Sequence, residues 1–285
     1  MSKNIIIKDR NGNPKIYEGI DKVIFMDTEG NDATFVLQEQ IPASVIFGEN
    51  SPEIISAVSQ EISANNMTSQ EVFDTYGWSL GDKTSITLTT GEVIEMQIIG
   101  FNHDDKSDGS GKAGITLQMV DCLATRYTMN STNTNAGGYA ASKMKTETLP
   151  TLKALLPQEW QDVIKLVDKK SANGGGSNYS ETLTTSDNLF LLSGVEVFGS
   201  EGSYGTAQDG ANEGNQYEYW NGKGAVDRIK KRDEDADGVP ERDEIWFMRS
   251  CIYFLGSDFS SVGTDGAARN SSATSICGVV FAFCI

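Results

Sequence analysis

The sequence has little of the side-chain chemistry on which most enzymes depend. It contains one histidine, His103, in 285 residues, which excludes a zinc site of the H-E-x-x-H type because that site needs two. His103 lies beside Asp104, but no G-x-S-x-G motif accompanies it. Paired carboxylates abound, yet no spacing singles out a glycosidase pair. The sequence therefore predicts no catalytic centre.

Cysteine is also scarce. The four cysteines form no C-x-x-C pair, and so few in a chain of this length do not favour a disulfide framework. We expect them to be buried as small hydrophobic residues.

Positive charge and long apolar runs are both lacking. Lysine and arginine number 23 against 40 aspartates and glutamates, which gives a formal net charge of −17. Such a chain repels polyphosphate and anionic lipid, so we expect neither nucleic acid nor a membrane surface as a partner, and cations are better candidates. No apolar run reaches the roughly 18 residues of a membrane span, so membrane insertion is not expected. The opening stretch lacks the features of a signal peptide, which predicts synthesis in the cytoplasm.

What is present indicates a folded protein of the α+β class. Hydrophobic residues make up 38% of the chain and can fill a substantial core. Residues 1–50 are typical of a small β-rich segment that ends in a linker near residues 38–52, and a helical connector covers 51–76. In that connector Thr68 and Glu71 have the spacing of a capping box. Residues 77–285 alternate extended and helical patterns and form the main predicted domain.

Short apolar runs place the expected strands, at 4–9, 22–27, 33–38, 84–101 (two strands around a turn), 114–124, 244–249 and 278–285. Helical spacing begins at Ser51 and Pro52, with Ile54, Ile55, Val58 and Ile62 on one face. A second helical region covers 140–167, broken at Pro150 and Pro157, with a core stripe of Leu152, Leu155, Trp160, Val163 and Ile164.

The stretch "DEDADGVPERDE", residues 233–244, matches the calcium-loop pattern D-x-D-x-D-G-x5-E. A hard cation needs six to eight oxygen ligands, and alternating aspartates supply them. The expected ligands are Asp233, Asp235, Asp237, the carbonyl of Val239 and the carboxylate of Glu244. Only one flank is plausible as a helix, so a paired EF-hand is not expected. We expect a structural Ca²⁺ that relieves repulsion among the acidic groups.

The stretch "GSGKAG" at 109–114 satisfies the G-x-G-x-x-G spacing. It follows a polar loop and leads into a strand, whereas a dinucleotide fingerprint follows a strand and opens a helix. We therefore do not interpret it as a nucleotide site.

Several stretches resemble a family of phage and bacterial proteins of C-type-lectin-like fold, akin to formylglycine-generating enzymes. They are "GWSLGD" at 77–82, "MVDCLATRYTMNSTNTNAGGYAASKM" at 119–144, "LPTLKALLPQEWQDVIKLVDKK" at 149–170, "LFLLSGVEVFG" at 189–199 and the tail from "WFMRS" to "GVVFAFCI". The tail is similar to the variable region of proteins diversified by retroelements, in which chosen codons change and framework codons do not. The amino-terminal strands resemble attachment segments of phage tail proteins.

In that resemblance the tail contains fixed framework residues with displayed residues between them. The framework residues are Trp246, Arg249, Ser250, Phe259, Val262, Gly266, Ala273, Gly278, Val279, Phe283 and Ile285. The displayed candidates for ligand binding are Ile252, Tyr253, Leu255, Ser257, Asp258, Arg269, Asn270, Ser272, Thr274 and Ile276. Aromatic and guanidinium side chains dominate binding hot spots, which favours Tyr253 and Arg269 among them.

The resemblance implies a non-enzymatic receptor-binding protein of a phage tail or cell surface. Its expected partner is a protein or glycan receptor on a host cell, and its expected location is the virion, with other tail proteins and a homotrimer as further implied partners. Two alternatives remain at this point. One is a structural virion component held by calcium, and the other is an oxidase of the formylglycine-generating type. That oxidase needs a pair of cysteine thiolates for copper, and Cys277 and Cys284 lie seven residues apart on opposite faces of an expected strand, which makes them poor co-ligands.

Overall fold

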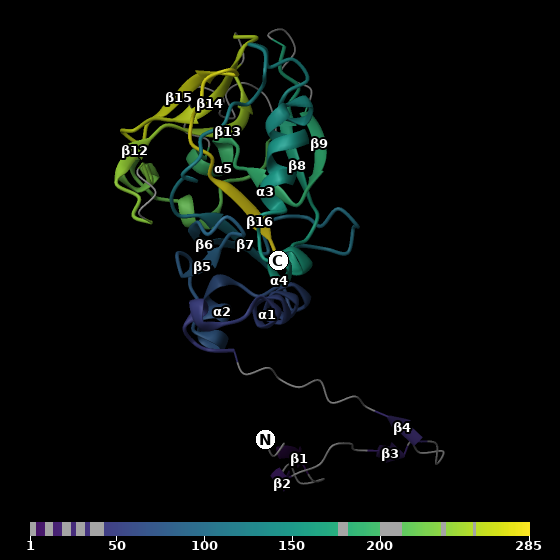
Figure 1. Cartoon of the computed structure of the whole chain (residues 1–285). Coiled ribbons are helices and arrows are strands. Elements are labelled where there is room, and N and C mark those ends of the chain that lie inside the picture. Colours follow the sequence, from purple (N-terminus) through teal and green to yellow (C-terminus); the bar gives the residue numbers. More distant parts are fainter. Residues whose placement is uncertain are drawn as a thin grey trace. The chain divides into compact units, whose positions relative to one another are not determined.

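The computed structural model describes residues 43–175, 182–199, 213–234, 238–252 and 255–285, together with the backbone of four strands nearer the amino terminus. The chain divides into two compact units, Met1–Pro42 and Ala43–Ile285 (Figure 1). Helices occur together with several antiparallel sheets, which confirms the α+β class. The expected helical connector, residues 51–76, lies in the same compact unit as the rest of the large domain.

The smaller unit contains two antiparallel hairpins. They pair β1 (Asn4–Lys8) with β2 (Pro14–Glu18) and β3 (Ile24–Met26) with β4 (Asp32–Thr34). The β2 strand was not predicted, because it begins at Pro14, in a stretch whose residues favour a turn. Proline is compatible with the first position of a strand.

The larger unit is built on a five-stranded antiparallel sheet in the order β10–β16–β7–β6–β5. Its strands are β5 (Lys83–Thr87), β6 (Val93–Phe101), β7 (Ile115–Met119), β10 (Leu189–Leu191) and β16 (Phe281–Cys284). The last strand of the chain is internal to the sheet, and every residue of it is buried. This explains the uninterrupted apolar sequence at the carboxyl end.

Two helices pack at one end of this unit. In α1 (Pro52–Ala64) the predicted face residues Ile55, Val58 and Ile62 are buried, and α2 (Ser69–Tyr76) begins with the predicted capping box of Thr68 and Glu71. A Cβ at Gly114 would lie 2.0 Å from the Ser59 carbonyl oxygen of α1. The last glycine of "GSGKAG" therefore serves the close approach of α1 to the start of β7.

A second sheet lies at the opposite end of the unit from α1 and α2 (Figure 1). It is three-stranded and antiparallel, with β13 (Trp246–Cys251), β14 (Asp258–Val262) and β15 (Ala268–Ser272). Two further hairpins pair β8 (Val167–Ala172) with β9 (Thr182–Asp187) and β11 (Lys230–Arg232) with β12 (Arg242–Glu244). A bridge between Trp246 and Gly278 joins β13 to the segment before β16.

The remaining described helical turns are short. They are η1 (Phe47–Glu49), η2 (Tyr139–Ala141), the π-turn η3 (Met144–Thr148), α3 (Leu149–Lys153), α4 (Gln158–Val163), α5 (Gly194–Phe198), η5 (Glu218–Trp220) and α6 (Ala225–Arg228). The helical region expected over 140–167 is thus divided, with Pro150 in the first turn of α3 and Pro157 as the residue before α4. Of its predicted core stripe, Leu152, Trp160, Val163 and Ile164 are buried, and Leu155 is partly buried. Within the described part of the chain, no helix combines the length and hydropathy needed to span a bilayer.

Candidate ligand-binding surface

Arg249 of β13 connects the three-stranded sheet to the buried segments that pack against it. Its side chain is fully buried, and its guanidinium makes a two-pronged ion pair with Glu196 of α5, in which the Nη2–Oε1 distance is 2.8 Å. The same group donates to the carbonyl oxygens of Lys170, Leu191 and Glu213, at 2.9 to 3.0 Å. These contacts use all five N–H donors of the guanidinium, so the buried charge is fully satisfied.

A second buried cation, Lys169 of β8, extends this network. Its ammonium lies 2.6 Å from Asp104 Oδ1 and 2.6 Å from Glu196 Oε1. Tyr217 and Thr116 each donate to Asp104 Oδ2 at 2.8 Å. Burial alone would raise the pKa of Asp104, but the neighbouring Lys169 holds it well below its usual range. The carboxylates are therefore ionised and paired.

His103, Asp104 and Glu196 are the only described group of three or more side chains of metal-ligand type that come close together, with ligand atoms within 4.8 Å of one another. Lys169 already sits between the two carboxylates of this group. A metal ion there would have to displace a buried ammonium, so these residues do not fit a metal site.

The framework residues of the tail share one property, which is burial. All eleven are buried: Trp246, Arg249, Ser250, Phe259, Val262, Gly266, Ala273, Gly278, Val279, Phe283 and Ile285. Gly266 has φ +72°, and a Cβ there would lie 1.7 Å from the Ala225 carbonyl oxygen. That position accepts only glycine for two independent reasons.

Most of the predicted contact residues between them are accessible. Arg269, Thr274 and Ile276 are exposed, and Leu255, Ser257, Asp258, Asn270 and Ser272 are half-buried. Ile252 is the exception, because it is only 1% exposed and cannot present its side chain to a ligand. Tyr253 lies outside the described residues.

The strand register divides the accessible residues between two faces of the β14–β15 hairpin. Asp258 lies opposite Ser272, and Ser261 lies opposite Arg269. Since side chains alternate along a strand, Asp258, Asn270 and Ser272 share one face, and Arg269 lies on the other. Arg269 instead pairs with Asp265, 2.6 Å away, and both side chains are about half exposed. The sequence grouped these residues together, whereas the register separates them.

One contiguous polar group results. Ser257 and Asn270 both donate to the carboxylate of Asp258, and Ser272 is hydrogen-bonded to Thr274 and to Asn133. We call this group the polar face; its members are Asn133, Ser257, Asp258, Asn270, Ser272 and Thr274.

Asn135 holds the polar face in place. The side chain is fully buried, and its Nδ2 donates to the carbonyl oxygens of Leu255 and Asp258 at 2.9 and 2.8 Å. Its Oδ1 accepts from the Gly175 amide at 2.9 Å. One side chain thus joins three separate segments. Sequence reasoning missed it, because an asparagine in "NSTNTNAGG" is typical of an ordinary loop.

Glu196 was missed too, although "SGVE" carried a usable signal. Ser193 and Glu196 have capping-box spacing, and the structure contains both reciprocal bonds at the start of α5. Its pairing with Arg249 and Lys169 depends on residues distant in sequence.

The acidic stretch 233–244 comprises the connection between β11 and β12 and the strand β12 itself, so two strands and not two helices adjoin the connection. Asp233 Oδ2 accepts from the Gly238 amide at 2.8 Å, and its Oδ1 is buried with no hydrogen-bond partner among the described residues. Glu244 is committed elsewhere, since its Oε2 accepts from Arg232 Nε at 3.0 Å. Asp235 and Asp237 lie outside the described residues. Among the described residues, Asp233 Oδ1 is thus the one expected ligand atom shown to be buried and unpaired, whereas the pairing of Glu244 with Arg232 does not fit the closing position of a calcium loop.

All four cysteines are free and buried, as predicted. Burial raises the pKa of each thiol, to about 11 for Cys277. Cys284 contacts Asp104 and Thr116, whereas Cys277 is bridged to Tyr127. Cys277 and Cys284 thus lie in different surroundings.

Comparison with known proteins gives one match. No curated protein and no solved structure matches the chain. The family described as "Domain of unknown function (DUF6273)" matches residues 113–285, from the start of β7 to the last residue. This range contains Arg249, Glu196 and Lys169 of the buried network, Asn135 and the polar face, but not Asp104. Since it covers more than half of the sequence, the chain belongs to the DUF6273 family.

Proposed function

We propose that the chain is a binding protein that recognises a cell-surface receptor through the polar face. The observation that carries this proposal is the division of burial along the tail: all eleven framework positions are buried, while accessible polar side chains stand between them. Such an arrangement allows the displayed residues to change without loss of the core.

The rigidity of the support favours binding over catalysis. Arg249 and Asn135 fix the strand and the loop beneath the polar face through eight side-chain hydrogen bonds to other segments. A preorganised surface loses less conformational entropy when it binds.

The proposal includes a C-type-lectin-like fold for residues 77–285. In its support, the last strand of the chain lies inside an antiparallel sheet beside strands from the start of the domain, and a second small sheet carries the polar face. By the same resemblance the chain would belong to a phage tail or surface-display protein, with a protein or glycan receptor, other tail proteins and a trimeric assembly as partners.

Cell binding by variants tests the proposal. Labelled protein would be titrated against a panel of bacterial strains and counted by flow cytometry. We expect the double variant Asn270→Ala/Thr274→Ala to bind about tenfold more weakly, because each truncation removes hydrogen bonds worth about 1 kcal/mol. Arg269→Ala is the matched control, since it changes the same strand on the opposite face. Equal binding by the double variant and the parent chain would refute the placement on the polar face.

Population sequencing tests the diversification separately. In a population that carries the gene, we expect substitutions to concentrate in codons 251–276 and to spare the framework codons there. An even, low rate along the gene would indicate a binder of fixed specificity or a structural protein.

A calcium-stabilised structural component is a second candidate, favoured by the unpartnered Oδ1 of Asp233. In this case the cation would hold the β11–β12 connection, and no receptor would be found.

A further inference from the structure

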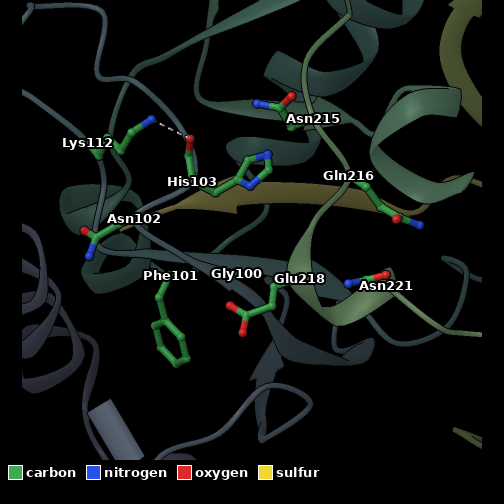
Figure 2. Close-up of a pocket in the computed structure, with 9 residues that line it drawn as sticks. All are labelled: Gly100, Phe101, Asn102, His103, Lys112, Asn215, Gln216, Glu218 and Asn221. Atoms are coloured by element: carbon green, nitrogen blue, oxygen red, sulfur yellow. Dashed lines mark hydrogen bonds between the residues drawn. The ribbon is translucent and has the colours of Figure 1, made fainter. Parts of the chain in front are cut away.

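A cavity lies at the end of β6 and is separate from the polar face. Its volume is about 390 Å³, and it is lined by Gly100, Phe101, Asn102, His103, Lys112, Asn215, Gln216, Glu218 and Asn221. Figure 2 shows that two segments distant in sequence, 100–112 and 215–221, enclose it. The volume is near the lower end of the range for small-molecule sites.

His103 is held in a defined orientation in this cavity. Its ring stacks on Tyr217 with centroids 3.9 Å apart and planes 24° apart, and the Tyr217 hydroxyl donates to the buried Asp104. A Cβ at Gly100 would lie 3.0 Å from the Tyr217 ring, so a small residue is needed beneath the stack. The pKa of His103 is lowered by burial, although nearby carboxylates oppose the shift, which favours a neutral ring with one donor and one acceptor nitrogen.

Several other polar groups lining this cavity have no partner among the described residues. Asn215 and Asn221 are exposed, and no side-chain hydrogen bond forms at either within the described chain. Asn102 donates through Nδ2 to the carbonyl oxygens of Ile62 and Met67, but its Oδ1 is buried and unpartnered. Gln216 is different, because its amide points away from His103 (Figure 2) and donates to the carbonyls of Val197 and Trp220.

The charges of the lining argue against an anionic ligand. Lys112 is its only cation, and the ammonium is already engaged by the His103 carbonyl oxygen and by Asp105, each at 3.0 Å. Glu218 adds a negative charge, and the whole chain carries −17. An apolar ligand is equally disfavoured, because Phe101 is the only large apolar side chain of the lining and is 8% exposed.

Glu218 already accepts a hydrogen bond from the Ser69 hydroxyl, so the amide and imidazole groups carry the argument. Among the described residues these groups have unused donors and acceptors, and they match a ligand in which each group both gives and takes a hydrogen bond. Hydroxyl groups do this. We propose that the cavity around His103 binds a small neutral polyhydroxylated molecule of the monosaccharide class. This inference is independent of the polar face and of the function proposed for it.

The single histidine provides the test. Isotope-labelled full-length protein would be titrated with glucose, galactose, mannose and N-acetylglucosamine, and the His103 ring signals followed by NMR. We expect at least one sugar to shift these signals saturably, with a millimolar dissociation constant. Asn221→Ala should weaken this binding by about fivefold to tenfold, the effect of losing one hydrogen bond. Its matched control is Gln158→Ala, which truncates an exposed amide on α4 and should change nothing.

Three outcomes would overturn the proposal. No saturable shift with any of the four sugars would exclude the ligand class. A shift produced by inorganic phosphate and by none of the sugars would assign an anion site instead. Sugar binding that Asn221→Ala and Asn215→Ala both leave unchanged would place the ligand outside this cavity. The result of the cell-binding experiment with the polar-face variants would not change these conclusions about the cavity, because the polar-face residues do not line it.

Discussion

At the scale of single residues, Arg249 illustrates how one buried charge determines a surface. Replacing it with alanine leaves Glu196 buried with only Lys169 as its cationic partner. Breaking a buried ion pair in this way destabilises proteins by about 3–5 kcal/mol. We expect a loss of this size for Arg249→Ala in urea denaturation. Arg269→Ala is the control of the same residue type, and its half-exposed ion pair with Asp265 should contribute less than about 1 kcal/mol. Similar losses for the two variants would contradict the assigned role.

Glu213 gives a prediction with a sign in pH. Burial raises its pKa above the ordinary value of 4.5, against the opposing influence of Arg249, with Ser250, the Ala172 amide and Glu196 also facing it. A raised folded-state pKa means that the stabilising contribution is present at low pH and is lost as pH rises through that pKa. Glu213→Gln cannot ionise, so its free energy of unfolding should fall less as pH rises. The variant should therefore be at least as stable as the parent chain at neutral pH. Urea denaturation from about pH 5 to about pH 8 measures it. A Gln variant that is clearly less stable at neutral pH would show instead that the ionised carboxylate is stabilising.

At the scale of elements, the loop before β14 depends on contacts from elsewhere in the chain. Asn135 supplies two hydrogen bonds to the loop and one to Gly175. We expect Asn135→Ala to destabilise the protein by roughly 2–4 kcal/mol, since three buried hydrogen bonds are lost. Amide hydrogen exchange in 255–258 should become faster.

Asn133→Ala is the neighbouring control for this element. Asn133 is exposed, and its Oδ1 accepts a hydrogen bond from the Ser272 hydroxyl. The variant Asn133→Ala should leave the amide hydrogen exchange of 255–258 unchanged while it weakens receptor binding. Unchanged exchange in Asn135→Ala would mean that the loop is ordered by its own backbone.

The elements also show where sequence reasoning succeeds. Strands β5, β6, β7 and β16 and helices α1 and α2 were predicted, because apolar periodicity and end signals are local. Other strands were missed, namely β2, β8, β9, β10, β11, β12, β14 and β15. The region 140–167 also divides into short turns, because tertiary packing outweighs weak local preference there.

At the scale of the whole molecule, calcium is the factor that can be added or removed. If a cation binds the β11–β12 connection, saturating Ca²⁺ should stabilise the chain by about 2.7 kcal/mol at a hundred times the dissociation constant. We expect a chelator to lower the melting temperature by a few degrees, in line with that free energy. Asp233→Asn should abolish this effect.

Glu244 distinguishes this site from the calcium loop expected from the sequence. Because its carboxylate is paired with Arg232, Glu244→Gln should lower stability with or without calcium and leave the response to chelator intact. If Glu244→Gln lost the response to chelator and Asp233→Asn kept it, the calcium ligands expected from the sequence, including Glu244, would be correct.

The sequence by itself determined the α+β class, the burial of the cysteines and the positions of the strands with strong apolar periodicity, because these follow from composition and from spacing over a few residues. The framework residues implied by the resemblance are all buried, and eight of the ten displayed candidates are at least partly accessible. Only the tertiary structure decided that Ile252 is buried, that Arg269 and Asn270 lie on opposite faces, and that Glu244 forms an ion pair with Arg232. Strand register and ion pairing join residues far apart in the chain, and no local pattern encodes which partners meet. The cavity around His103 has the same origin, since its two walls come from segments more than a hundred residues apart.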